Sequence, residues 1–129
     1  MDKNVVLVLK DFVFILAGST FGVFLRFFIK NNFKKKLGFN INYISIVNIL
    51  SALFLGGFLA LELSNKNLIM LFYIGFLGCL STFSSFIYQL FQLIQRRDYI
   101  SFFFLYIDIL LISSFLFLAG YLTISILKF

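Results

Sequence analysis

The sequence predicts an all-α integral membrane protein with four transmembrane helices, and its composition and charge pattern support this prediction. Of its 129 residues, 62% are hydrophobic and only 12% are charged, whereas a soluble domain has about 25% charged residues. The charges are concentrated in short gaps between long apolar stretches, as expected for loops at a lipid headgroup surface. Lipid rather than water must therefore cover much of the chain.

Four apolar stretches are long enough to cross a bilayer, whose core of about 30 Å needs about 20 helical residues. These stretches are residues 12–29, 41–63, 68–94 and 99–127. Their continuous apolar character favours helices over the alternating pattern of a membrane barrel. We therefore expect a single four-helix membrane domain over residues 1–129.

The net charge of +6 is spread over the gaps between helices, so we expect no nucleic-acid binding. Six basic residues flank the ends that the first and third loops join: Lys30, Lys34, Lys35, Lys36, Arg96 and Arg97. Four lie on the opposite side, near the termini and in the second loop: Lys3, Lys10, Lys66 and Lys128. By the positive-inside rule this small difference weakly favours cytoplasmic first and third loops, and it permits insertion in both orientations.

Composition also argues against an enzyme. The chain has no His and one Cys, Cys79, so a zinc site or a Cys–His nucleophilic centre cannot be built. We expect no enzymatic activity.

The third stretch contains small and hydroxyl residues that are unusual for a membrane helix. Gly75 and Gly78 are followed by four hydroxyl residues: Ser81, Thr82, Ser84 and Ser85. Glycine lowers helix stability by about 1 kcal/mol relative to alanine, and hydroxyls can satisfy backbone groups that a break sets free. The pattern is compatible with a break near mid-membrane whose carbonyls hold a cation, and equally with close packing of small residues.

Three further residues are candidates for contact with an anion. Phe83 and Phe86 lie three residues apart, which makes them neighbours on a helix surface, and the positive edge of an aromatic ring can face an anion. In a chain with 21 Phe, filling of the core or contact with lipid is the ordinary role. Asn48 lies in the middle of the second stretch, where an amide must be bonded, either along a water path or between helices.

The first stretch contains one embedded charge, and the fourth contains another. Gly18, Gly22 and Arg26 recur every four residues, which gives one face for close packing and for a partly buried charge. Asp108 lies about ten residues into the fourth stretch, where a carboxylate should be paired or neutralised. We expect an ion pair between Arg26 and Asp108, with a protonated or hydrated Asp108 as the alternative.

These motifs resemble the Fluc (CrcB) fluoride channels over essentially the whole chain. The first stretch resembles the family pattern G-G-x-x-G-A-x-x-R-Y at Gly18, Gly22, Arg26 and Phe27. The second is similar to V-N-x-x-G-S-F-x-x-G at Val47, Asn48 and Gly56. The third resembles G-F-x-G-G-x-T-T-F-S-T-F at Gly75, Phe76, Gly78, Thr82, Phe83, Ser84 and Phe86. Small residues replace family residues at Ser19, Ser51, Cys79 and Ser81, and Gln89 stands where the family often has a carboxylate.

The resemblance implies an antiparallel, dual-topology dimer, formed with a second copy or a close paralogue, that has two fluoride pores at its interface. It implies that fluoride meets the ring edges of Phe83 and Phe86, the amide of Asn48, and a polar track of Ser84, Ser85 and Tyr106. It also implies that the carbonyls of Gly78 and Ser81 hold a structural Na⁺. The implied function is passive, potential-driven export of fluoride across the plasma membrane.

Two other functional classes remain compatible with the residues. A small multidrug/proton exchanger would also have four helices, but it needs a carboxylate inside the first helix, and Asp11 lies only at the edge of that helix. A membrane assembly factor is the other alternative, although it would leave the hydroxyl and Phe track without a purpose.

Overall fold

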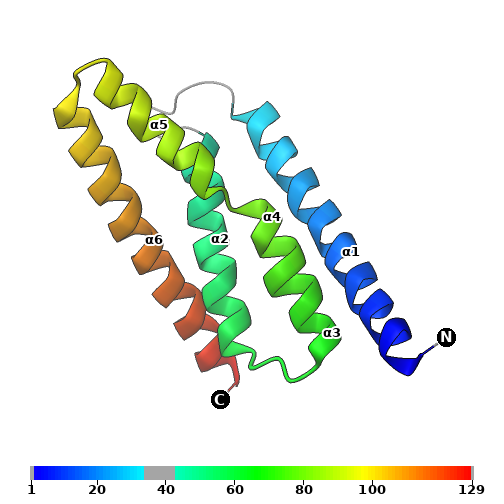
Figure 1. Cartoon of the computed structure of the whole chain (residues 1–129). Helices are drawn as coiled ribbons and strands as arrows, with labels where there is room; N and C mark the ends of the chain where they lie inside the picture. The colour runs from blue at the N-terminus through cyan, green and yellow to red at the C-terminus, as the bar shows by residue number, and fades with distance from the viewer. Residues whose placement is uncertain (1, 34–42, 129) are drawn as a thin grey trace.

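The computed structural model describes residues 2–33 and 43–128, which form a bundle of helices (Figure 1). In chain order the elements are α1 (Lys3–Asn32), α2 (Tyr43–Ala60), α3 (Lys66–Ile69), the π-helix η1 (Met70–Leu77), α4 (Gly78–Leu80), α5 (Phe83–Gln95) and α6 (Tyr99–Lys128). Four spans are long and apolar enough to cross a membrane: Lys3–Asn32, Tyr43–Ala60, Lys66–Gln95 and Tyr99–Lys128. The prediction of four membrane-spanning helices is confirmed, and the chain is a multi-pass membrane protein.

The termini and the turn after α2 lie at the same end of the bundle (Figure 1). Helix α1 begins at Lys3 rather than near residue 12. Residues 5–9 are apolar and contain neither glycine nor proline, so nothing in the sequence stops the helix from extending toward the N-terminus.

Helix α1 packs directly against η1 and α4 through glycines. A methyl group on Gly18 would overlap the carbonyl oxygen of Leu71, and one on Gly75 would lie 2.6 Å from the carbonyl oxygen of Ile15. Gly22 continues the same contact against the carbonyl oxygen of Phe76. Because only glycine leaves room here, the two backbones touch without side chains between them. We call this contact the α1 seam.

Helices α2 and α6 form a second seam of the same kind, which we call the α6 seam. A methyl group on Gly56 would overlap the carbonyl oxygen of Phe117, and one on Gly120 would overlap that of Leu53. The neighbouring Gly57 is different, because the nearest atom to a methyl group there is 3.6 Å away, an ordinary contact.

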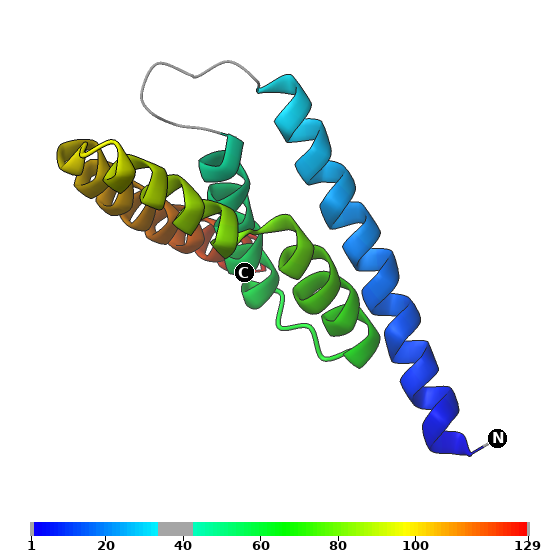
Figure 2. The same cartoon turned by 45° about the horizontal axis from the view of Figure 1, so that its top comes forward.

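Larger side chains fill the rest of the bundle. Phe54 and Phe58 of α2 pack edge-on or tilted against Phe72 and Phe76 of η1, with ring centroids 4.8 to 6.5 Å apart. Helix α5 turns away from η1 and lies along α6 (Figure 2). The core beneath α5 consists of Ile44, Phe86, Leu90, Leu105 and Ile109.

Polar bonds secure the ends of the helices. Lys66 pairs with Asp11 on α1, and Lys128 at the end of α6 lies 3.5 Å from Glu62. At the other end of α6, Asp98 accepts a hydrogen bond from the Ser101 N–H at 3.1 Å. The hydroxyl of Ser101, followed by its backbone N–H, lowers the pKa of the Asp98 carboxyl, so this helix cap is charged at neutral pH.

Candidate functional site at the α4–α5 junction

The candidate site is built around the two residues that separate α4 from α5. Ser81 has φ −74° and ψ 148°, and Thr82 has φ −139° and ψ 100°, so both adopt extended backbone between two helical segments. The Ser81 N–H and hydroxyl both donate to the carbonyl of Leu77 at 3.1 Å. At the start of α5, the Phe86 N–H donates to the carbonyl of Thr82 at 3.4 Å.

The side chain of Asn48 on α2 bonds to both backbone groups of Thr82. Asn48 Oδ1 accepts from the Thr82 N–H at 3.0 Å, and Asn48 Nδ2 donates to the Thr82 carbonyl at 3.4 Å. Two residues in neighbouring antiparallel β-strands exchange the same pair of bonds. The amide of Asn48 therefore bonds to Thr82 as the backbone of a neighbouring strand would. We call this pair of bonds the Asn48 clamp.

The junction leaves two carbonyl groups without their helical donors. In a continuous helix the Thr82 N–H would bond to the carbonyl of Gly78, and the Ser85 N–H to that of Ser81. The Thr82 N–H bonds to Asn48 instead, and within the described residues the Ser85 N–H does not bond to Ser81. Both Gly78 and Ser81 are exposed at the surface of the chain, so these carbonyls could receive an ion.

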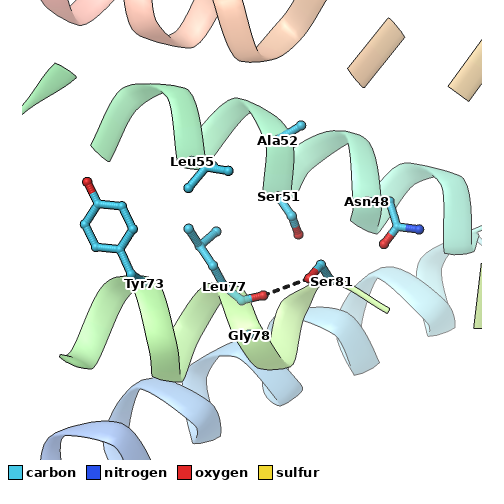
Figure 3. A pocket seen from close by; sticks show the side chains of 8 residues that line it. All are labelled: Asn48, Ser51, Ala52, Leu55, Tyr73, Leu77, Gly78 and Ser81. Atoms are coloured by element: carbon cyan, nitrogen blue, oxygen red, sulfur yellow. Dashed lines mark hydrogen bonds between the residues drawn. The ribbon is translucent and has the colours of Figure 1, made fainter. Parts of the chain in front are cut away.

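A surface recess of about 370 Å³ joins these groups (Figure 3). Its lining residues are Asn48, Ser51, Ala52, Leu55, Tyr73, Leu77, Gly78 and Ser81. The amide of Asn48 and the hydroxyl of Ser81 lie toward one end of the recess in Figure 3, and Tyr73 lies at the other. The recess thus brings together a residue predicted to meet the anion and both residues predicted to hold the cation.

The two phenylalanines have opposite environments in the single chain. Phe83, the first residue of α5, is 75% exposed, whereas Phe86 is 7% exposed and packs in the core. Ser84 is exposed, Ser85 is half-buried, and Tyr106 on α6 is 43% exposed. Helical spacing correctly places both rings on α5 but does not distinguish the ring that projects from the ring that is buried.

The expected ion pair between Arg26 and Asp108 is wrong for the single chain. The only ion pairs among the described residues are Lys66–Asp11 and Lys128–Glu62. The reason is the arrangement of the bundle, because α1 packs on η1 and α4, α6 packs on α2 and α5, and α1 and α6 do not touch. Counting residues along each helix compares depths in the membrane but says nothing about which helices are neighbours.

Three buried polar atoms have no hydrogen-bond partner within residues 2–33 and 43–128: Ser45 Oγ, Thr82 Oγ1 and Gln89 Oε1. Gln89 points inward from α5, on the same side as Phe86 and Leu90. An unpaired polar atom in a dry interior is costly, and one of the three, Thr82 Oγ1, belongs to the junction itself.

Sequence reasoning missed the role of Thr82 and did not include Ser51 or Tyr73. Thr82 takes part through its backbone N–H and carbonyl, groups that every residue except proline has. Ser51, three residues after Asn48 on the same helical face, was noted in the sequence only as a small residue that replaces a family residue. Tyr73 lies in an apolar stretch, and no signal in the sequence marks it.

Comparison with known proteins shows the family of this chain. The profile of the family described as "CrcB-like protein, Camphor Resistance (CrcB)" matches residues 13–122. A Prochlorococcus marinus protein (strain MIT 9312) named "Fluoride-specific ion channel FluC 2" is 55% identical over 114 residues, which cover 88% of this chain and 93% of that protein. A protein of the same name from P. marinus subsp. pastoris (strain CCMP1986 / NIES-2087 / MED4) is 51% identical over 113 residues, or 88% and 92% of the two chains. The match spans all four membrane helices and includes the junction, and the chain belongs to the CrcB-like family.

Proposed function

We propose that this chain forms a fluoride-selective ion channel that exports fluoride across the plasma membrane. The observation that carries the proposal is the 55% identity over 93% of a relative named as a fluoride-specific ion channel. This match spans Asn48, the α4–α5 junction and the Phe pair, which are the groups with chemistry suited to a small anion. The membership in a channel family also agrees with the expectation that the chain is not an enzyme.

The proposed fluoride contacts replace the water that this strongly hydrated ion gives up. An amide N–H of Asn48 donates a hydrogen bond, and the ring edges of Phe83 and Phe86 present positive charge. Ser84, Ser85 and Tyr106 continue the polar track. The 75% exposure of Phe83 supports a role outside the core of the single chain, because a large ring directed outward is available to a pore wall.

The proposed assembly is an antiparallel dimer of two copies, or of this chain and a close paralogue, with a pore on each side of the interface. The weak difference in basic residues between the two membrane faces supports insertion in both orientations. In this assembly the α4–α5 junction lies near the middle of the membrane, where junctions of two subunits face each other.

We further propose that the carbonyls of Gly78 and Ser81 hold a structural Na⁺ at the centre of the dimer. The two carbonyls lack their helical donors, and hard cations prefer oxygen ligands. The described residues contain no cluster of three or more His, Cys, Asp or Glu that could hold a metal, so the carbonyls are the better candidates. When bound, the ion would supply a positive charge that stabilises the meeting of the two junctions.

Transport needs no energy source beyond the membrane potential. An inside-negative potential drives a monovalent anion outward by about 2.3 kcal/mol per 100 mV. The structure gives no support to the multidrug/proton exchanger, because Asp11 is bonded to Lys66 at the end of the bundle and α1 has no other acid within its span.

Fluoride efflux from liposomes tests the proposal. Purified protein is reconstituted into liposomes loaded with potassium fluoride, and efflux is started with a potassium ionophore and followed with a fluoride electrode. We expect rapid fluoride efflux and no chloride efflux from matched chloride-loaded liposomes. Equal rates for both anions, or no protein-dependent fluoride efflux, would contradict the proposed function.

A further inference from the structure

The Asn48 clamp satisfies the Thr82 N–H, which would otherwise be unpaired in a membrane, and gives the Thr82 carbonyl a second donor beside the Phe86 N–H. Thr82 has extended dihedral angles, so its N–H and carbonyl cannot both bond within a helix. Such groups in a lipid environment must find partners inside the protein, since an unsatisfied group there costs several kcal/mol. The side chain of Asn48 supplies the partner of the Thr82 N–H at 3.0 Å and a further donor to the Thr82 carbonyl at 3.4 Å. The clamp also fixes the distance between α2 and the start of α5.

The clamp also removes the helical hydrogen-bond donor of the Gly78 carbonyl. The helical donor for that carbonyl is the Thr82 N–H, and Asn48 Oδ1 holds this N–H instead. Gly78 and Asn48 line the same recess, so the carbonyl that has lost its helical donor belongs to a residue of that recess. The side chain of Asn48 therefore competes directly with the helix for one hydrogen.

We propose that Asn48 is a positioning residue for the cation site as well as a fluoride contact. Its carbonyl oxygen holds the junction open and keeps the Gly78 carbonyl free, while its amide nitrogen keeps one N–H for the anion. An amide has two N–H donors, and one of them is engaged by Thr82, which fixes the direction of the other. This inference rests on the proposed function for the identity of the ions, but the clamp itself does not depend on them.

Two substitutions separate the two roles. Asn48→Leu keeps the size of the side chain and removes both bonds. Asn48→Asp keeps an oxygen acceptor for the Thr82 N–H but gives up the donor and repels an anion. Ser51→Ala is the matched control, because Ser51 lines the same recess while its hydroxyl bonds only within α2, to the carbonyl of Val47 at 2.7 Å.

The first measurement is the Na⁺ concentration that gives half-maximal thermal stabilisation of the purified protein, in fluoride-free buffer. We expect Asn48→Leu to raise this concentration about tenfold or more, because the part-buried Thr82 N–H loses its hydrogen-bond partner. Asn48→Asp and Ser51→Ala should keep it at or below the value of the parent protein. Asn48→Asp should nevertheless lose fluoride efflux. A folded Asn48→Leu protein with the Na⁺ response of the parent overturns the proposal.

The second measurement follows the clamp without any ion. In protein labelled with ¹⁵N-threonine, the amide signals of Thr20 and Thr123, which lie in α1 and α6, serve as internal references for Thr82. We expect only the Thr82 signal to move in Asn48→Leu, and an unmoved signal overturns the clamp.

If Asn48→Leu does not fold, Asn48→Asp provides the test, because a tenfold weaker Na⁺ response in that variant contradicts the proposal. If the stability of the parent protein does not depend on Na⁺, the proposed cation is wrong. The Thr82 signal alone then tests the clamp.

Discussion

Helix α2 makes two contacts that use opposite means. Toward α6 it presents Gly56, so that backbone meets backbone with no side chain between them. Toward the α4–α5 junction it presents the side chain of Asn48, whose amide reaches across to Thr82. The first contact requires a residue without a side chain, because a methyl group on Gly56 would overlap the carbonyl oxygen of Phe117. The second depends on the position of two polar atoms, and it is the one with chemistry for an ion.

The glycine seams and the α4–α5 junction also differ in the polarity of the residues around them. In both glycine seams the atoms nearest to the glycines are mostly backbone atoms of an apolar helix. The junction has the surface recess and unpaired carbonyls near it, together with the buried unpaired Thr82 Oγ1. The seams therefore hold the scaffold rigid, while the junction holds the polar groups that a pore needs.

The largest change in the free energy of unfolding should come from adding one methyl group to the α6 seam. Gly56→Ala places that group against the carbonyl oxygen of Phe117, which belongs to a helix backbone and cannot move aside. We expect the free energy of unfolding in detergent to fall by about 3 kcal/mol, at the upper end for overpacking. Gly57→Ala is the control, with 3.6 Å to the nearest atom, and should change stability by less than about 1 kcal/mol. Equal stability of the two variants would refute a tight seam.

A smaller change in the free energy of unfolding should distinguish Phe83 from Phe86. Phe86→Ile changes the shape of a core residue that is 7% exposed, so we expect a loss of about 1 kcal/mol in unfolding free energy. Phe83→Ile alters a ring that is 75% exposed and should leave the stability of the single chain unchanged. Both should lower fluoride efflux, since both remove a positive ring edge. Efflux at the parent rate through both variants would show that the ring-edge mechanism is wrong.

The smallest effect concerns coupling between the two halves of the bundle. Because α1 and α6 do not touch, Arg26→Ala and Asp108→Asn should change the unfolding free energy additively, within about 0.5 kcal/mol. The measurement is a double-mutant cycle under conditions where the protein is monomeric. A larger coupling energy would mean that the two side chains meet after all.

The sequence predicted the parts of the fold that follow from local composition. Apolar length predicted four spans, and the hydroxyl residues around Ser81 drew attention to the third of them. Which helices become neighbours was not predictable in this way, because depth along a helix does not determine its partners; the Arg26–Asp108 pair failed for that reason. The partner of Asn48 was also hidden, since it is a pair of backbone groups rather than a side chain.

The Asn48 clamp joins residues that are 34 positions apart in the chain, and this has a consequence for the order of folding. Synthesis runs from the N-terminus, so α2 (Tyr43–Ala60) can reach the bilayer before residue 82 does. The amide of Asn48 must spend that interval bonded to water, to lipid headgroups or to the insertion machinery, because hydrocarbon offers it no partner. The junction can then take its extended form only when α2 and the later helices dock, so helix insertion precedes the formation of the proposed ion site.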